Sequence, residues 1–251
     1  MNAKQKAEQF AKFHVKGKPV ILYNAWDAGS AKAIVDSGAK AIATSSWSVA
    51  EAQGYRDGES IPLAFVEQIA GRIAATVELP VTVDFEGGYS EAEAGLAQNI
   101  ARVLDLGIVG VNFEDRVVNG QGLYAVARQA KRIATLRKAA DEKDIPLFIN
   151  ARTDVFFQDG DPHRLIDDVL KRAEAYAEAG ASGFFIPGLL DDALIGRICK
   201  SVVLPVNVMV MGGVPSNKRL TELGVARISY GPIAYVDAMN ALKENAKSAH
   251  S

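Results

Sequence analysis

The sequence has little of what several classes of protein and site require. It contains one cysteine, Cys199, which excludes an intramolecular disulfide and a metal site built on several cysteines. Its 28 Lys and Arg residues are outnumbered by 30 Asp and Glu residues, and the lack of a basic excess argues against a nucleic-acid-binding surface. The function is therefore expected to need neither a cysteine cluster nor a polyanionic partner.

Long apolar runs and targeting signals are also missing. No stretch approaches the ~20 apolar residues of a membrane-spanning helix. Residues 1–18 are polar and lysine-rich and lack the apolar region of a secretory signal. We expect no membrane association and, with a single cysteine, a location in the reducing cytoplasm. The glycine pairs Gly87-Gly88 and Gly212-Gly213 fit neither a P-loop nor a dinucleotide fingerprint.

What the sequence does have is a regular alternation of short apolar runs and longer amphipathic stretches. Eight amphipathic stretches predict helices, the first at Ala28–Ser37 and the last at Pro232–Ala246. Eight apolar runs predict strands, at Val20–Tyr23, Ala41–Thr44, Val81–Phe85, Val109–Phe113, Leu147–Asn150, Gly183–Ile186, Val206–Met209 and Arg227–Ser229. Such runs are typical of parallel strands that helices cover. Eight alternating units in 251 residues favour an α/β fold closed into a (β/α)8 barrel of TIM type.

Four glycines support these element boundaries. Gly38, Gly107, Gly180 and Gly224 each lie where a helix should end before the next strand, the place for a left-handed cap. No linker or low-complexity segment interrupts the pattern. We therefore expect one domain over residues 1–251.

Three acidic residues should gather at one end of this barrel. The active site of such a fold lies at the carboxyl ends of the strands, where Asp84, Glu86 and Glu114 follow the third and fourth strands. Residues i and i+2 of a strand point to the same side, which would place Asp84 beside Glu86. Carboxylates this close repel one another unless a cation neutralises them. Oxygen ligands suit Mg²⁺, with Mn²⁺ as an alternative.

We expect Asp84 to bind the ion directly and the two glutamates to act through water. The alternative is an ordinary ion-pair network at the mouth of the barrel, without a metal. The residues alone leave both interpretations open.

Other residues at the strand ends are candidate substrate ligands. Arg152 ends the fifth strand, where it could bind a substrate carboxylate or phosphonate through two hydrogen bonds, or pair with Glu114 or Asp154. Ser45 and Ser46 could bind an anion or serve only the turn. Three further strand-end residues complete the set of candidates: Tyr23, Trp47 and Asn207.

Two other features bear on the chemistry. His14, His163 and His250 all lie away from the strand ends, so no histidine base and no Ser-His-Asp arrangement is expected. The loop at residues 116–122, which contains Asn119 and two glycines, is either a lid that closes over the site or a plain surface loop.

The motifs at these positions resemble those of the isocitrate lyase and phosphoenolpyruvate mutase superfamily, over about residues 20–235. The segments that carry the resemblance are Ser45-Ser46, Gly54-Tyr55-Arg56-Asp57, Val83-Asp84-Phe85-Glu86-Gly87-Gly88-Tyr89, Phe113-Glu114-Asp115, Asn150-Ala151-Arg152-Thr153-Asp154 and Ala173-Glu174-Ala175-Tyr176 with Ala179-Gly180-Ala181. Each motif alone is weak, but their order along the chain and their places at strand ends are specific.

The resemblance implies roles for these residues. Asp84, Glu86 and Glu114 match the acids that hold Mg²⁺, and Asp57 matches an acid near the metal and the substrate. Ser45 and Ser46 match the segment that binds the substrate carboxylate. Arg152 matches the arginine that contacts the part of the substrate that is transferred or released. The family chemistry is cleavage of a C–C or P–C bond in a small 2-oxo acid through an enolate, and its members form homo-oligomers, often tetramers, in which the last helix swaps between subunits.

This sequence departs from the family pattern at three places. The Lys-Lys-Cys-Gly-His loop of the isocitrate-cleaving lyases is absent, and the corresponding segment begins at Arg116. Pro187 stands where the mutase has a histidine, and the mutase loop lysine is missing, although Asn119 could stand in for its asparagine. Glu86 also replaces the more common aspartate.

Three functions remain open. The first is a metal-dependent C–C lyase of a 2-oxo acid, by oxaloacetate-type decarboxylation or retro-aldol cleavage, with Asp57, Arg152 and Asn119 as catalytic candidates. The second is P–C chemistry, as in a phosphonopyruvate hydrolase or a phosphonomutase. The third is metal-dependent binding of a 2-oxo acid without turnover.

Overall fold

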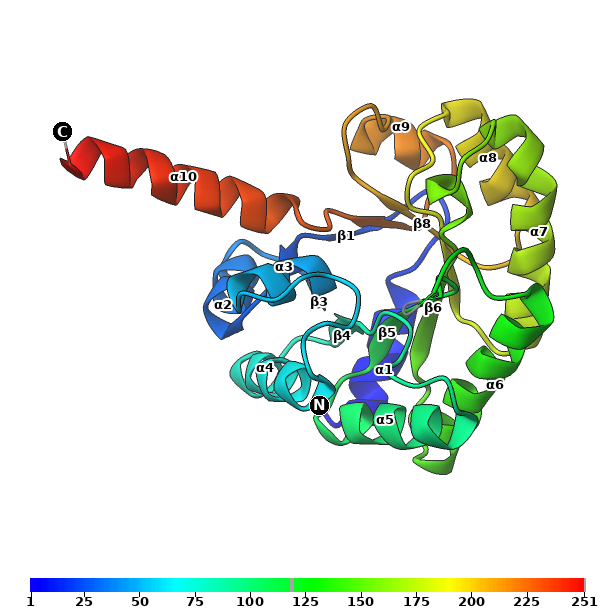
Figure 1. Ribbon diagram of the computed structural model, residues 1–251, viewed down its shortest axis with the longest axis horizontal. Coiled ribbons are helices and arrows are strands. Elements are labelled where there is room, and N and C mark those ends of the chain that lie inside the picture. Colours follow the sequence, from blue (N-terminus) through cyan, green and yellow to red (C-terminus); the bar gives the residue numbers. More distant parts are fainter. Residues whose placement is uncertain (118–119, 251) are drawn as a thin grey trace.

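The computed structural model describes residues 1–117 and 120–250, and in these residues parallel strands curl into a nearly closed barrel (Figure 1). The strands are β1 (Val20–Leu22), β2 (Asn24–Ala25), β3 (Ile42–Thr44), β4 (Val81–Asp84), β5 (Gly110–Glu114), β6 (Phe148–Arg152), β7 (Gly183–Phe185), β8 (Val206–Met209) and β9 (Arg227–Ser229). Their order is β1-β9-β8-β7-β6-β5-β4-β3-β2. The predicted α/β barrel fold is thereby confirmed.

The first predicted strand, Val20–Tyr23, ends one residue early as β1, and a separate short strand, β2, follows it. β1 pairs with β9, whereas β2 pairs with β3, and the break between them falls at Tyr23. The side chain of Asn24 bridges this seam, the gap in the barrel wall between β1 and β2. Its Oδ1 accepts hydrogen bonds from the backbone N–H groups of Tyr230 (3.1 Å) and Gly231 (2.9 Å), and its Nδ2 donates to the carbonyl of Thr44 at 2.7 Å. The barrel is thus closed partly by a side chain.

Helices surround the strands. They are α1 (Ala3–Lys12), α2 (Ala28–Asp36), α3 (Ser46–Ala52), α4 (Leu63–Thr76), α5 (Glu93–Asp105), α6 (Val126–Glu142), α7 (Pro162–Glu178), α8 (Asp192–Ser201), α9 (Asn217–Glu222) and α10 (Ile233–His250), with a 3₁₀ turn η1 (Val155–Phe157). The four glycines expected at helix ends have φ angles of 83–95°, which confirms their left-handed caps. None of the described helices is both long enough and apolar enough to cross a membrane.

Two helices were not among those predicted. α1 covers the amino-terminal end of the barrel, where the buried Phe10 meets Phe148 edge-on at a ring-centroid distance of 5.4 Å. His14 stacks on Phe148 at 3.9 Å, and burial lowers the pKa of His14 to about 3, so this histidine is a neutral packing residue. The second helix, α3, begins at Ser46, directly after β3.

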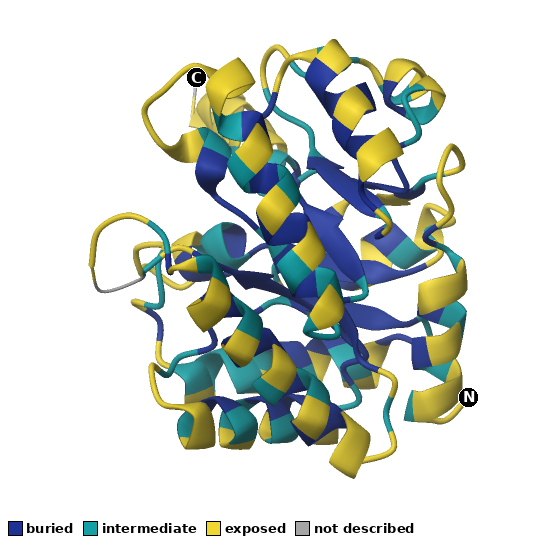
Figure 2. Ribbon diagram, turned by 90° about the vertical axis from the view of Figure 1, so that its right-hand side faces the viewer, coloured by how far each residue is buried: buried dark blue, intermediate teal, exposed yellow. Residues whose placement is uncertain are grey.

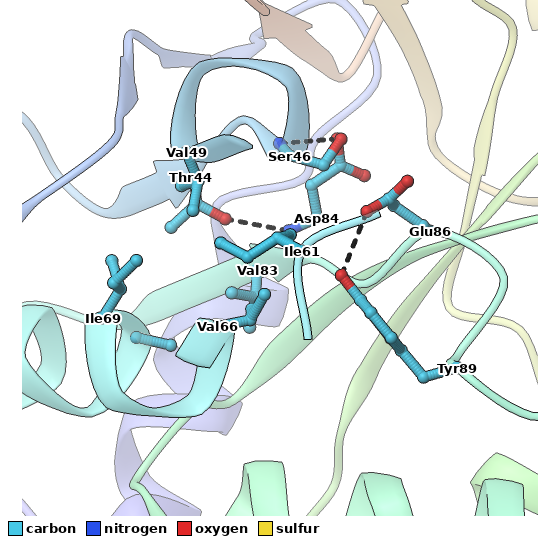
Figure 3. Close-up of a pocket in the computed structure, with 11 residues that line it drawn as sticks. Thr44, Ser46, Val49, Ile61, Val66, Ile69, Val83, Asp84, Glu86 and Tyr89 are labelled. Carbon is cyan, nitrogen blue, oxygen red and sulfur yellow. Dashed lines mark hydrogen bonds between the residues drawn. The ribbon is translucent and has the colours of Figure 1, made fainter. Parts of the chain in front are cut away.

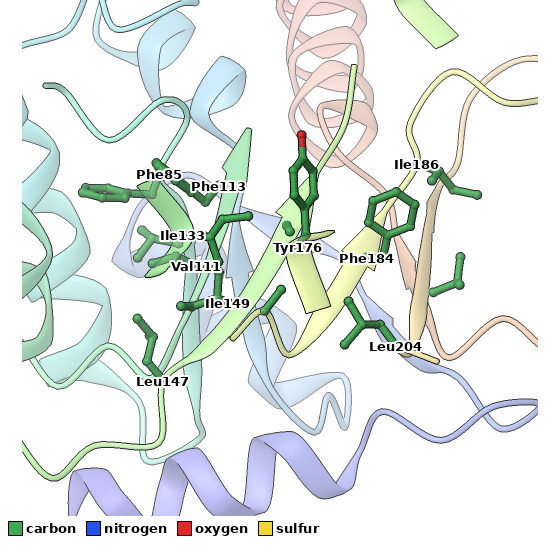
Figure 4. Packing of buried hydrophobic residues seen from close by; sticks show 14 of the residues in the cluster. Phe85, Val111, Phe113, Ile133, Leu147, Ile149, Tyr176, Phe184, Ile186 and Leu204 are labelled. Atoms are coloured by element: carbon green, nitrogen blue, oxygen red, sulfur yellow. The ribbon is translucent and has the colours of Figure 1, made fainter. Parts of the chain in front are cut away.

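The strands alternate between an outer apolar face and an inner face with polar residues. Val111, Phe113, Ile149 and Phe184 belong to the main hydrophobic cluster, which packs the barrel wall against the helices (Figure 4). Figure 2 shows the same layering, with buried strands inside helices whose outer faces are exposed. The intervening positions face the interior of the barrel, which we call the bore. These include Asn112, Asn150, Asn207 and Arg227, all buried.

The last helix differs from the others because it leaves the barrel. α10 extends away from the body of the molecule (Figure 1), and Ala234 near its start is its buried residue. Val236 and Leu242 on this helix are 39% and 60% exposed. The helix therefore presents apolar side chains that the described chain does not cover.

Candidate active site

A cavity of about 420 Å³ opens at the carboxyl ends of the strands, where the sequence predicted the site. It brings together six of the predicted residues: Ser45, Ser46, Trp47, Asp57, Asp84 and Arg152. Residues that were not predicted to bind substrate or metal complete its wall, among them Asn24, Asn112, Arg116, Asp154, Gln158 and Phe157. This volume suits a ligand of a few carbon atoms with one or two charged groups.

Asp84 occupies the centre of the acidic part of this site. It is the last residue of β4, and its backbone N–H donates to Thr44 Oγ1 at 3.0 Å. Ser46 Oγ donates to Asp84 Oδ2 at 2.9 Å, with a longer bond of 3.3 Å from the Ser46 N–H (Figure 3). Asn112 Nδ2 donates to the other oxygen, Oδ1, at 3.3 Å. The carboxylate is therefore held at both oxygens while it faces the cavity.

Glu86 lies near Asp84, but not for the reason predicted. β4 ends at Asp84, and Glu86 has a left-handed backbone (φ 49°), so the rule that strand residues i and i+2 share a side does not apply. The Glu86 side chain accepts hydrogen bonds from the Glu59 N–H at 2.8 Å and from the Tyr89 hydroxyl at 3.1 Å. It turns toward a small hollow beside Asp84 (Figure 3) rather than into the main cavity.

The left-handed turn at Glu86 is stabilised from a second segment. Tyr89 also has a positive φ (58°), and its N–H donates to Glu59 Oε1 at 2.8 Å. Glu59 itself has a φ of 56°. Non-glycine residues in this conformation cost free energy, and they are found where surrounding contacts fix them, often at functional sites. Here those contacts place a buried carboxylate next to Asp84.

Burial raises the pKa of Glu86 to about 8, and the charges of Asp57 and Asp84 add to the shift. The unfolded chain releases this proton near the ordinary value of 4.5, whereas the fold retains it up to about pH 8. Stability from the neutral form is therefore fully present below 4.5 and is lost as the pH rises through 8. We expect the melting temperature of the metal-free protein to fall between pH 5 and 8.5, as measured by circular dichroism in EDTA.

A bound cation should replace the proton on this acidic group, so added Mg²⁺ should reduce the fall in melting temperature. The matched control is Glu86→Gln, which cannot ionise and should flatten the metal-free profile. A wild-type profile that is equally flat without metal would contradict the raised pKa of Glu86.

Arg152, at the end of β6, lies between two acids. Its Nη1 is 3.0 Å from Glu114 Oε2, and its Nε is 2.6 Å from Asp154 Oδ1. Burial disfavours its charge, but Glu114 and Asp154 outweigh that effect and raise the pKa of Arg152. The ion pairs predicted as the alternative to substrate binding are thus present, yet Arg152 also lines the cavity. A guanidinium has five N–H donors, so some of them remain for a ligand.

Asp57 lies across from Asp84 on the loop before α4. Ser46 Oγ is 3.4 Å from Asp57 Oδ1, so one hydroxyl lies between two carboxylates. Desolvation raises the pKa of Asp57, the charge of Asp84 adds to the shift, and Arg152 opposes it. Asp57 and Asp84 together form an acidic edge of the cavity, with Arg152 as the nearby cation.

Two of the predicted substrate-binding residues, Tyr23 and Asn207, do not line this cavity. Tyr23 lies outside it, 40% exposed and near the Tyr230 ring, at a centroid distance of 5.2 Å. Asn207 is buried in the bore, where its Oδ1 accepts from Ser229 Oγ at 3.2 Å. Asn119 lies outside the described residues. In the described part of the same loop, Arg116 forms an antiparallel β-bridge with Leu123, and it lines the cavity. Whether the loop closes over the site as a lid stays a prediction.

The sequence reasoning missed Glu59, Tyr89 and Asn112. Asn112 carried a signal, because it is a polar residue within an otherwise apolar predicted strand and therefore had to find a buried partner. Gly87-Gly88 after Glu86 also signalled a turn with positive φ, and Gly88 indeed has φ 83°. Glu59 carried no such signal, since only the fold brings it to Glu86.

The donor set fits a hard divalent cation bound by few direct ligands. Within residues 1–117 and 120–250, no three His, Cys, Asp or Glu side chains stand close enough together to hold one ion directly. Glu114 is tied to Arg152 and Glu86 to Glu59, so Asp84 is the carboxylate best placed for direct contact. Mg²⁺ commonly takes one or two carboxylates and keeps several waters. The excess of acids at Asp57, Asp84 and Glu86, with raised pKa values at Asp57 and Glu86, favours a cation there.

Several known proteins are similar to this chain. The family profile described as phosphoenolpyruvate phosphomutase matches residues 10–250. An uncharacterized protein of Mycobacterium tuberculosis is 31% identical over 239 residues, which cover 95% of this chain and 88% of that protein. An oxaloacetate decarboxylase of Ectopseudomonas mendocina is 30% identical over 185 residues, covering 70% of this chain and 60% of that enzyme.

A solved structure from Burkholderia cenocepacia, which carries the provisional name of phosphonomutase, is also similar. It superimposes with a TM-score of 0.96 at 44% identity, over 99% of this chain and 100% of that one. The resemblance seen in the motifs is confirmed by these matches: the chain belongs to the phosphoenolpyruvate phosphomutase family, within the isocitrate lyase and phosphoenolpyruvate mutase superfamily.

Proposed function

We propose that this protein is a Mg²⁺-dependent lyase, able to use Mn²⁺, that cleaves a C–C bond in a small 2-oxo acid, as in the decarboxylation of oxaloacetate. The observation that carries the proposal is the pairing of an acidic edge, Asp57 and Asp84, with the Arg152 guanidinium on the wall of one small cavity. A cation-binding edge and an anion-binding group in one cavity suit a substrate with a 2-oxo carboxylate at one end and a second carboxylate at the other.

Each residue has a part in this proposal. Asp84 would hold the ion, with Glu86 and Glu114 acting through water, and the bound ion would stabilise negative charge that develops on the 2-oxo oxygen. Arg152 binds the departing carboxylate end of the substrate, and its two acidic partners fix its orientation. Phe185 and Met209 contribute apolar surface to the cavity wall and limit the access of water to the reacting carbon.

The second candidate is P–C chemistry, which the similarity to the Burkholderia protein favours. Arg116 adds a second cation to the cavity wall and could help to bind a phosphonate. Against it, Pro187 stands where the resemblance calls for the histidine of the mutases. The similarity to an oxaloacetate decarboxylase supports the C–C reaction instead.

A turnover screen distinguishes the two. Purified protein with Mg²⁺ is given oxaloacetate, 2-methylisocitrate or phosphonopyruvate, and pyruvate, phosphate and phosphoenolpyruvate are measured against blanks that contain Mg²⁺ alone. We expect pyruvate from oxaloacetate at well above the blank rate. Phosphate or phosphoenolpyruvate from phosphonopyruvate would replace the proposal by the second candidate. No product from any substrate, with Mg²⁺-dependent binding of oxalate retained, would indicate a binding protein without turnover.

We also propose a homo-oligomer, a dimer or a tetramer, in which α10 packs on another subunit. The support is the path of α10 away from its own barrel and the exposure of Val236 and Leu242 on it.

A further inference from the structure

Arg227 is a buried cation without a matching anion beside it. Its side chain, on β9, is 0% exposed, and in the described part of the chain no carboxylate lies within ion-pairing distance of it. Its Nε donates to Ser229 Oγ at 3.2 Å and its Nη2 to Asn112 Oδ1 at 3.1 Å, while Nη1 has no hydrogen-bond partner among the described residues. Burial of a charge in this state costs free energy, so a purely structural role would be served better by an apolar side chain.

The contact with Asn112 connects Arg227 to the active site across the bore. β9 and β5 are separated by three strands in the sheet, so the Arg227 side chain must span the interior of the barrel to reach Asn112. Asn112 Oδ1 also accepts from Asn150 Nδ2 at 2.9 Å, and Asn112 Nδ2 donates to Asp84 Oδ1 at 3.3 Å. One short chain of hydrogen bonds thus runs from Arg227 to the carboxylate at the floor of the cavity.

The two end residues, Arg227 and Asp84, fix which groups donate and which accept along this series of hydrogen bonds. A guanidinium can only donate hydrogen bonds, and an ionised carboxylate can only accept them. An asparagine amide can present either its oxygen or its nitrogen, and a flipped Asn112 would turn its carbonyl oxygen toward Asp84. The donor-only Arg227 makes that flip unfavourable, because its own hydrogen bond would be lost inside the bore. Asn112 is therefore held with its N–H group toward Asp84.

We propose that Arg227 is a positioning residue for the metal site: from inside the bore it fixes the Asn112 amide so that Asn112 holds one oxygen of Asp84 and leaves the other to Ser46 and the ion. The proposal rests on the proposed function, since it takes Asp84 as the metal ligand. Hydrogen-bond partners that orient a metal ligand typically change metal affinity by about 10–100-fold when they are removed.

A simple charge effect predicts the opposite result, which makes the proposal testable. A cation in the bore repels a cation at Asp84, so removal of the Arg227 charge should tighten metal binding if charge were its main influence. Loss of positioning should weaken metal binding. Arg227→Met keeps a side chain of similar size but removes both the charge and the hydrogen bonds. Arg227→Lys retains the charge and loses the planar arrangement of donors.

The experiment measures Mn²⁺ binding to the full-length protein by electron paramagnetic resonance, without substrate, together with unfolding in urea. We expect Arg227→Met to bind Mn²⁺ about tenfold more weakly than wild type, while its urea midpoint stays equal or rises. Arg227→Lys should fall between the two proteins in affinity. Asn112→Leu, which breaks the chain at its middle, should weaken binding to a similar extent, and the double variant should be no weaker than either single variant.

The outcomes distinguish a failure of the proposed function from a failure of the positioning role of Arg227. A wild-type protein that binds no Mn²⁺ contradicts the proposed function itself. Wild-type binding with unchanged or tighter binding by Arg227→Met contradicts only the positioning role. If Arg227→Met does not fold, Arg227→Lys and Asn112→Leu decide: unchanged Mn²⁺ affinity in both would overturn the proposal, and weaker binding in both, with urea midpoints retained, would support it.

Discussion

Asp84→Asn should lose metal binding and turnover together while the protein stays folded. The substitution keeps the size of the side chain and removes the charge of the carboxylate that faces the cavity. Loss of an outer partner of a metal ligand costs about 10–100-fold in metal affinity, so loss of the ligand itself should exceed that range. Turnover of the substrate found in the screen should fall by about 10³-fold or more, because stabilisation of the developing charge is lost as well.

The matched control is Asp36→Asn, on the exposed end of α2, which removes one carboxylate of the same type far from the cavity. It should keep wild-type Mn²⁺ affinity and turnover. Isothermal titration with Mn²⁺ and product assays on all three proteins make the comparison. If Asp84→Asn still bound Mn²⁺ with wild-type affinity, the ion would have to lie elsewhere and the assignment of Asp84 would be wrong.

Arg172→Met should destabilise the protein more than any other single substitution considered above. Asp115 is fully buried next to the site, and its Oδ2 accepts from Arg172 Nη1 at 3.0 Å and from the Tyr176 hydroxyl at 2.8 Å. Its Oδ1 accepts from the Asp154 N–H at 3.0 Å. Without Arg172 the Asp115 charge would be buried and uncompensated, and such losses cost about 3–5 kcal/mol of unfolding free energy.

Urea denaturation followed by circular dichroism measures this effect at pH 7. Arg164→Met, on the same helix α7, is the control, because its side chain is 88% exposed and its ion pair with Asp161 should contribute little. Protonation of Asp115 would relieve the variant, since burial already raises the pKa of this carboxyl group. The loss of unfolding free energy in Arg172→Met, relative to wild type, should therefore be smaller at pH 5 than at pH 7. Equal urea midpoints for the two arginine variants would show that the buried pair is dispensable.

This network also explains two motif residues, Asp115 and Tyr176, that the sequence left without a role. Asp115 belongs to Phe113-Glu114-Asp115 and Tyr176 to Ala173-Glu174-Ala175-Tyr176, and the fold brings them into direct hydrogen-bond contact. Glu114 faces Arg152 at the site, while its neighbour Asp115 supports the wall behind it. The second motif therefore serves to hold the first, which spacing along the chain could not show.

The barrel itself was predictable because parallel strands and their covering helices have different periods of apolar residues. β8 and β9 match the predicted ranges residue for residue, and Asp84 and Arg152 share one cavity as expected. These successes follow from local pattern and from the rule that the carboxyl ends of barrel strands meet at one face.

The failures have physical causes. α1 is polar overall, and only Ala7 and Phe10 are buried. Two apolar positions are too few to show the periodicity of a helix. The break at Tyr23 lies next to Asn24, whose Oδ1 accepts from the Tyr230 N–H, and the left-handed turn at Glu86 is stabilised by the Glu59 N–H. Both partners lie far away in the sequence. The link from Arg227 to Asp84 crosses the bore, and no periodicity along one strand predicts a contact with a strand on the opposite side.

The seam at Tyr23 changes how mutations at Asn24 should be understood. Asn24 lines the cavity, so an inactive Asn24 variant would ordinarily be taken to have lost a ligand contact. Yet its side chain also joins β2 to Tyr230 and Gly231, just before α10 begins. Such a variant would weaken the connection between the barrel and α10. A loss of activity would then reflect damage to the closure of the barrel as much as a lost contact with the substrate.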